Sequence, residues 1–191
     1  TIQAVSDKGL IFDSEDGTFR AKNNVTYSEA MVMVYNLMSK TGNLKASATN
    51  TLPIYQSVLN TYKIPTWSQS TVAYGLSAQI LMAADLPKFT TNGVSNPATR
   101  QDVAVMFGRA LSEKYDIYAG TGVNYNDVWR ISDEAMPYVD LLTRLGIVTG
   151  DDSGNFNPTA NITRAEMAVM MNKTYDPVSY THLRAHETSA H

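Results

Sequence analysis

A short segment recurs three times in this chain, and that repetition constrains the fold more than any other feature of the sequence. The segment reads NITRAEMAVM at residues 161–170, and it returns as NPATRQDVAVM and NNVTYSEAMVM around Thr99 and Thr26. Thr163 follows Thr99 by 64 residues, and Thr99 follows Thr26 by 73. A unit that recurs on this scale predicts tandem structural repeats, each one a supersecondary unit.

Each copy has the pattern of a helix start. Thr163 and Glu166 have the spacing of a capping box, in which each side chain accepts the other residue's backbone amide. Ile162 and Met167 flank the box at the positions of a hydrophobic staple. Arg164 then occupies the first helical position, where the helix dipole disfavours a cation. Helix formation therefore explains every residue of the motif except the arginine.

The residues before the capping box also repeat. LGIVTGDDSGNFNPTANITRAEM in the third copy aligns without gaps with KGLIFDSEDGTFRAKNNVTYSEA in the first. We expect Gly146 to end a helix in the left-handed conformation, and Gly154 to form a tight turn before a buried Phe156. Their counterparts in the first copy are Gly9, Gly17 and Phe19.

A helix is expected before each glycine stop. Apolar residues at helical spacing predict one over 133–145, with Pro137 in its first turn, and another over 68–82. The first copy retains almost none of this helix. The longer spacing between the first two copies falls near TNTLPIYQSVLNTYKI, where a further helix is predicted. The second copy also departs from the pattern, because its loop AADLPKFTTNGVS lacks the Gly-x-Phe turn.

These motifs resemble the S-layer homology family, in which a T-R-A-E motif follows a G-I-x-x-G-x-x-x-G-x-F-x-P turn. The third copy matches this pattern almost position for position, while the first reads T-Y-S-E and the second T-R-Q-D. The resemblance implies a mainly α fold of helix-loop-helix units in a pseudo-threefold arrangement. It divides the chain into a truncated first unit (1–40), a linker with an extra helix (41–66), a second unit (67–115) and a third unit (122–176).

The resemblance also implies a function. Members anchor secreted proteins to the Gram-positive cell wall, typically by binding a pyruvylated secondary polysaccharide in grooves between units. In that setting Arg164 and Arg100, together with the first amides of their helices, would bind a carboxylate from an exposed position. The alternative is that both arginines turn into solvent or pair with a nearby acid.

The remaining expected ligand-binding residues come from the same motifs and from the aromatic residues that precede each unit's first helix. Tyr27 replaces the motif arginine, so the first groove is expected to be weakened or lost. Trp67 and Trp129 are expected to lie half in the core and half in a groove. The complete expected set is Arg164, Arg100, Thr163, Thr99, Glu166, Asp102, Trp129, Trp67, Asp127 and Tyr27.

Composition narrows the classes of function. The chain of 191 residues has a net charge of −3 and no cysteine, which argues against nucleic-acid binding and against disulfides or thiolate metal sites. No apolar run is long enough to cross a bilayer, so membrane insertion is not expected. The expected location is extracellular, at the cell wall, and the chain is interpreted as an internal fragment, so a missing signal peptide is uninformative.

The tail, residues 177–191, breaks every pattern and holds all three histidines. PVSYTHLRAHET looks like an in-frame translation of a transposase adapter used in library preparation, so His182 and His186 are not interpreted as metal ligands. Deleting the tail is expected to leave the melting temperature unchanged. The rest of the chain has no histidine or cysteine, which argues against nucleophilic catalysis. The acidic loops do not match an EF-hand, and no cofactor is expected.

Two classes of function remain from the sequence. The first is a non-catalytic anchor that binds a cell-wall polysaccharide. The second is an assembly module that contacts other surface-layer proteins and whose sugar sites have degenerated. Retention of the motif arginine in two of the three copies favours the anchor.

Overall fold

The computed structural model describes residues 20–115, 117 and 123–175, and this part of the chain is mainly helical. Its only strands, within the described residues, form a two-stranded antiparallel hairpin. The elements in chain order are α2 (Tyr27–Lys40), η1 (Ala46–Ala48), α3 (Leu52–Thr61), η2 (Thr66–Ser68), α4 (Gln69–Ser77), η3 (Ala83–Lys88), β1 (Thr90–Thr91), β2 (Val94–Ser95), α5 (Arg100–Leu111), η4 (Val128–Arg130), α6 (Met136–Arg144) and α7 (Arg164–Tyr175).

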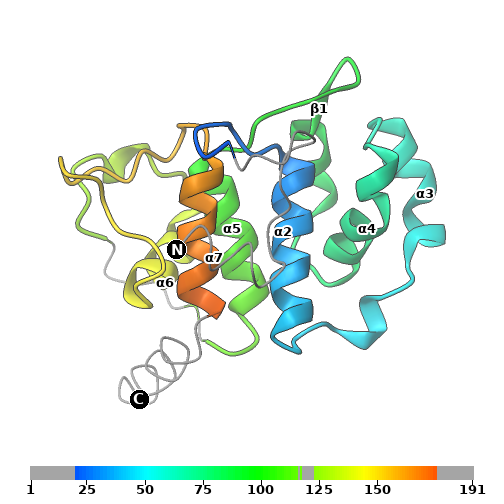
Figure 1. Cartoon of the computed structure of the whole chain (residues 1–191), viewed down its shortest axis with the longest axis horizontal. Coiled ribbons are helices and arrows are strands. Elements are labelled where there is room, and N and C mark those ends of the chain that lie inside the picture. Colours follow the sequence, from blue (N-terminus) through cyan, green and yellow to red (C-terminus); the bar gives the residue numbers. More distant parts are fainter. Residues whose placement is uncertain (1–19, 116, 118–122, 176–191) are drawn as a thin grey trace.

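The three repeated segments begin α2, α5 and α7, as the sequence predicts. Thr26 forms a full capping box with Glu29, and the Thr99 hydroxyl accepts the amide of Asp102 at 3.3 Å. Thr163 and Glu166 also exchange both capping bonds, each at 3.2 Å. The three helices run side by side with their capped ends at the same end of the molecule (Figure 1).

The segments before these helices hydrogen-bond to one another in a closed circle. The Val25 amide donates to the Ile162 carbonyl at 3.0 Å, and the Ile162 amide donates to the Ala98 carbonyl at 2.9 Å. The Ala98 amide donates back to the Val25 carbonyl at 2.8 Å, which closes the circle. Each of the three residues directly precedes a capping threonine, so the circle holds the three helix starts together.

A second circle uses the first amide of each helix. Helix N-termini leave their first amides without intrahelical partners. Here the amide of the first residue in each helix donates to the carbonyl three residues before the capping threonine of another unit. The three pairs are Arg164 to Asn23 at 2.9 Å, Tyr27 to Asn96 at 3.2 Å and Arg100 to Ala160 at 2.9 Å.

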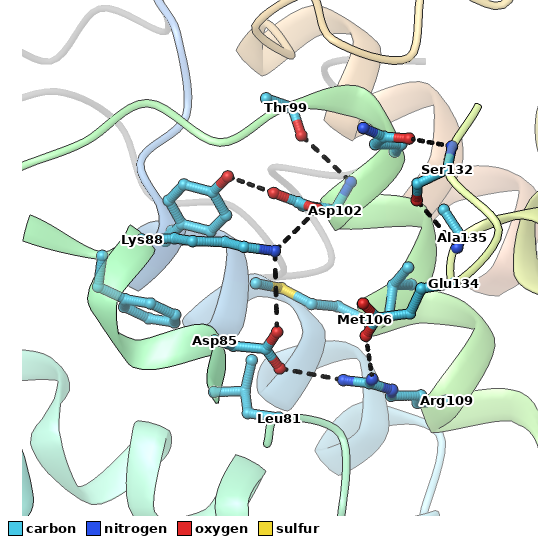
Figure 2. A pocket seen from close by; sticks show the side chains of 14 residues that line it. Leu81, Asp85, Lys88, Thr99, Asp102, Met106, Arg109, Ser132, Glu134 and Ala135 are labelled. Carbon is cyan, nitrogen blue, oxygen red and sulfur yellow. Dashed lines mark hydrogen bonds and ion pairs between the residues drawn. The ribbon is translucent and has the colours of Figure 1, made fainter. Parts of the chain in front are cut away.

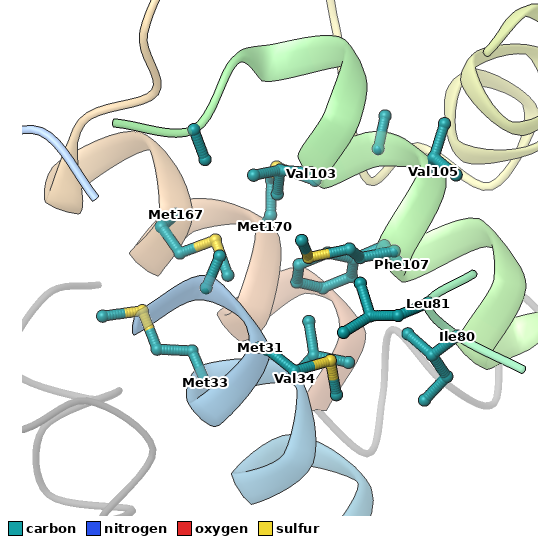
Figure 3. Packing of buried hydrophobic residues seen from close by; sticks show 14 of the residues in the cluster. Met31, Met33, Val34, Ile80, Leu81, Val103, Val105, Phe107, Met167 and Met170 are labelled. Atoms are coloured by element: carbon teal, nitrogen blue, oxygen red, sulfur yellow. The ribbon is translucent and has the colours of Figure 1, made fainter. Parts of the chain in front are cut away.

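One apolar core fills the space between the helices (Figure 3). Several buried methionines contribute to it, and their unbranched side chains adapt to irregular gaps between helices. Ile162 and Met167 are both fully buried, as expected for a hydrophobic staple. Among the largest fully buried side chains are Met31, Met33, Leu37, Phe89, Phe107 and Phe156.

The third unit follows the sequence prediction closely. Gly146 has φ +74° just after α6, and the Ile147 amide closes the helix end on the Leu142 carbonyl at 2.9 Å. Gly154 has φ +77°, and Phe156 beyond it is 1% exposed. The expected helix over 133–145 is shorter, because α6 begins at Met136, with Pro137 in its first turn.

The second unit differs from the expectation in two places. Its first helix, expected over 68–82, is α4 and ends at Ser77, because Gln79 has a left-handed φ of 62° that a helix cannot continue. Its loop does contain a buried phenylalanine, Phe89. Phe89 precedes the capping Thr99 by ten residues, whereas Phe156 precedes Thr163 by seven. The β1–β2 hairpin, turning at Asn92 and Gly93, makes the second loop longer.

The linker contains the additional helix that its apolar periodicity predicts, namely α3. Gly9, Gly17 and Phe19 of the first copy lie outside the described residues, as does the tail from 177 to 191.

Candidate ligand-binding groove

The motif arginines lie at the junctions between units. Arg100, from the second unit, forms an ion pair with Glu166 of the third, and its Nε donates to the Phe156 carbonyl at 2.8 Å. Arg164, from the third unit, pairs with Glu29 of the first, with 3.6 Å between Nη1 and Oε2. In both acids one carboxylate oxygen caps its own helix and the other pairs with the arginine.

Tyr27 occupies the corresponding place at the remaining junction. Its hydroxyl donates to a carboxylate oxygen of Asp102 in the second unit. Its ring lies 5.3 Å from the Phe89 ring, while the Arg100 guanidinium lies 5.2 Å from the Phe156 ring. Burial, and then the hydrogen bond to Asp102, raise the pKa of the Tyr27 hydroxyl well above its ordinary value, so it remains a donor at neutral pH.

This geometry corrects the expectation of an exposed Arg164 at an open helix end. The Arg164 side chain is 5% exposed. The first three amides of α7 are also occupied, since the Arg164, Ala165 and Glu166 amides donate to Asn23, Ala21 and the Thr163 hydroxyl. The corresponding amides of α5 are occupied in the same way. The starts of α5 and α7 therefore bind neighbouring units. Arg100 and Arg164 pair with nearby acids, which was the alternative to binding a ligand carboxylate.

The expected residues outside the capping motifs are spread over the surface. Trp67 and Trp129 are 59% and 76% exposed, which overturns the expectation that they lie half in the core. Asp127 accepts the amides of Phe156 and Asn157, both at 2.8 Å, and so fixes the loop of the third unit.

A pocket of about 300 Å³ brings Tyr27, Thr99 and Asp102 together (Figure 2). It lies between the start of α2, the outer face of α5, η3 and the turn before α6. The polar residues that complete its wall are Asp85, Lys88, Gln101, Arg109, Ser132 and Glu134.

Charged side chains form a continuous series of ion pairs along this pocket. Lys88 Nζ lies 3.6 Å from Asp102 and 4.0 Å from Asp85. Asp85 is 3.1 Å from Arg109, which also pairs with Glu134 at 3.0 Å (Figure 2). Lys88 is the loosely held member, because its side chain is 46% exposed and both its separations exceed hydrogen-bond length.

Arg109 is a pocket residue that lies outside the repeated motifs, although its spacing in the sequence could have identified it. Arg109 follows Asp102 by seven residues on α5, which places both on one face of the helix. Lys88 and Asp85 belong to an irregular 3₁₀ segment, and no periodic pattern relates them to α5.

Comparison with known protein families finds a match for two of the three repeated segments. The model of the S-layer homology domain matches residues 1–31 and 124–168. The chain therefore carries S-layer homology repeats in these two segments, the class that the third copy's motif indicated. S-layer homology domains are cell-wall anchoring modules, so the chain is associated with the cell surface or the cell wall.

The chain is also similar to an uncharacterised cell wall amidase of Bacillus anthracis, with 26% identity over 112 residues. The match covers 59% of this chain and 20% of the amidase, so the chain spans about a fifth of that relative's length. No helix within the described residues has both the length and the apolar character needed to cross a membrane.

Proposed function

We propose that this chain is a non-catalytic module that binds an acidic, pyruvylated cell-wall polysaccharide and so anchors a secreted protein to a Gram-positive wall. The observation that carries the proposal is the pocket around Asp102, where three carboxylates and two cations line a cavity between units. Carboxylates accept hydrogen bonds from sugar hydroxyls, and guanidinium groups donate hydrogen bonds to them. An ammonium group binds an acidic substituent.

Lys88 is the group we assign to the acidic substituent. It is the more exposed of the two cations, whereas the Arg109 side chain is 8% exposed and holds two acids. A ligand carboxylate replaces the loose contacts of Lys88 with Asp85 and Asp102 without leaving a buried charge unpaired. Of the ligand-binding residues expected from the sequence, Tyr27, Thr99 and Asp102 line this pocket. The proposal therefore departs from the expectation that the groove beside Tyr27 is weakened or lost.

Arg100 and Arg164 have a different part in this proposal. Each holds the capping glutamate of the next unit and keeps a groove wall in position. Arg100, with a side chain 15% exposed, is the one that a ligand carboxylate can reach by displacing Glu166. We further propose that the three units are related by a pseudo-threefold axis, an arrangement supported by the two closed circles of hydrogen bonds.

Lys88→Ala tests the anchor directly. Loss of a charge-assisted contact is expected to weaken binding about tenfold or more, while the melting temperature stays near that of the wild type because exposed ion pairs contribute little to stability. The measurement is co-sedimentation with purified Gram-positive cell walls, with and without the pyruvylated polymer. Lys40→Ala, an exposed lysine at the far end of α2, is the matched control and should bind as the wild type does.

The alternative is a module that contacts other surface-layer proteins. The specific observation in its favour is the exposure of Trp67 and Trp129, since tryptophan is enriched at protein interfaces. A folded Lys88→Ala variant that binds walls as tightly as the wild type would favour this alternative. Concentration-dependent self-association without polymer, measured by sedimentation velocity, would support it further.

A further inference from the structure

The linker that interrupts the repeat spacing builds a second pocket. Its turn at 49–53, which leads into α3, closes over the side of α2 and α4 and leaves a cavity of about 390 Å³. This cavity shares no lining residue with the pocket around Asp102. The longer spacing between the first two repeats therefore adds a cavity that the repeat unit itself does not supply.

Aromatic side chains give this linker pocket an ordered apolar wall. Tyr35 from α2 and Tyr74 from α4 meet edge to face, with ring centroids 5.2 Å apart and planes at 83°. The Tyr74 hydroxyl accepts the Lys45 amide at 2.9 Å, which fixes that ring further. Leu52 and Pro53 complete the apolar part of the wall.

The polar groups that the described part of the chain gives to the wall are all uncharged. The Thr49 and Thr51 hydroxyls donate to the carbonyls of Ala46 and Ala48, at 2.7 and 3.0 Å. Within the described residues, the side chains of Asn50, Ser70 and Thr71 make no hydrogen bond and remain available to a ligand. Asn50 has a left-handed φ of 57°, so its position in the pocket rim is set by the turn.

We infer that the linker pocket binds a neutral saccharide unit, such as an N-acetylhexosamine. A sugar ring presents apolar C–H faces and many hydroxyls, which match the half-buried Tyr35 ring, held in place by the buried Tyr74, combined with amide and hydroxyl groups. None of the described residues in the wall is charged, which disfavours an acidic sugar, because its carboxylate would lose hydration without gaining a partner there. The chain then holds two saccharide sites of different charge preference.

The test uses chitotriose, a neutral trimer of N-acetylglucosamine, and trigalacturonic acid as its acidic counterpart. Titration of the ¹⁵N-labelled chain with chitotriose should shift the amide resonances of 49–53 and 70–74, with weak affinity near the millimolar range. Trigalacturonic acid should not shift them.

Asn50→Gly removes the side-chain amide without backbone strain, because glycine tolerates the left-handed turn. It should weaken chitotriose binding about three- to tenfold, the effect of one lost neutral hydrogen bond. Asn92→Gly makes the same change at φ 52° in the hairpin, outside the pocket, and should bind as the wild type does. Chitotriose shifts that leave the amides of 49–53 and 70–74 unmoved, equal shifts of these amides with the acidic trimer, or unchanged binding by a folded Asn50→Gly variant would each overturn the inference.

Discussion

At the scale of single residues, each motif arginine joins two units through an ion pair. Arg164 has its guanidinium beside Glu29, and Glu29 in turn caps α2. Arg100 repeats this relation with Glu166, which caps α7. The cation at a helix start, unfavourable with its own dipole, is therefore offset by an acid that a different helix positions.

Arg164→Ala is accordingly expected to destabilise the chain by about 2 kcal/mol, because it leaves a partly buried carboxylate without its cation. Chemical denaturation measures the effect. Arg130→Ala, an exposed arginine beside Trp129, should change the free energy of unfolding by less than about 0.5 kcal/mol. Equal effects of the two substitutions would contradict the buried ion pair.

Tyr27 gives a pH-dependent prediction. The pKa of its hydroxyl is raised in the folded state by burial and by the hydrogen bond to Asp102. The stabilisation is therefore fully present below the unfolded pKa of about 10 and declines as the pH rises above it. Tyr27→Phe should cost about 1 kcal/mol at pH 7, from the lost hydrogen bond.

The difference in unfolding free energy between wild type and Tyr27→Phe should shrink as the pH rises from 10 to 11. Denaturant titrations of both proteins at each pH measure it. A difference that stays constant over this range would show that the hydroxyl does not titrate as its surroundings require.

At the scale of elements, each capping glutamate of α2 and α7 closes its own helix start and also pairs with an arginine of another unit. Thr163→Ala removes the cap of α7 and should cost about 1 kcal/mol in thermal or chemical unfolding. Thr159→Ala, an exposed threonine four residues earlier, is the control and should be nearly neutral. If both changes had the same effect, the capping bond would not be the source of the loss.

The contact between α5 and α6 depends on a close approach at Gly108. A Cβ at this position would lie 2.6 Å from the Tyr138 Cβ, so the two helices would have to move apart. We expect Gly108→Ala to destabilise by about 1–3 kcal/mol, despite alanine's better helix propensity.

Gly75→Ala in α4 is the matched comparison for Gly108→Ala. Its new methyl would meet the ends of the Leu81 and Met31 side chains at 2.9 Å, which can turn aside. We expect its loss of stability to be clearly smaller. A Gly108→Ala variant as stable as Gly75→Ala would mean that α6 is not held where the structure places it.

The local part of this architecture was readable from the sequence. Capping boxes, the glycine stop at Gly146 and the buried Phe156 were predicted, because each depends on residues within a few positions of one another. The hairpin at Asn92 and Gly93 was missed although this pair of residues is a strong turn signal. The ion pairs were not predictable, since Arg100 and Glu166 are separated by 66 residues and only packing brings them together.

At the scale of the whole molecule, the closed circle of hydrogen bonds predicts cooperative unfolding. The amides of Val25, Ala98 and Ile162 each depend on a different pair of units. We expect native-state hydrogen exchange to give them similar free energies of opening, close to that of global unfolding. Thr163→Ala should lower all three by the same amount. Separate values for the three amides would mean that the units open independently.

The circle of Val25, Ala98 and Ile162 also limits how many repeats such a chain can use. In an open solenoid every added repeat finds a free edge, and the terminal repeats need special caps. Here the third segment donates to the second, the second to the first and the first returns to the third, so the three satisfy one another. A fourth copy would therefore find no free amide or carbonyl in this circle, and it would have to pack through other surfaces.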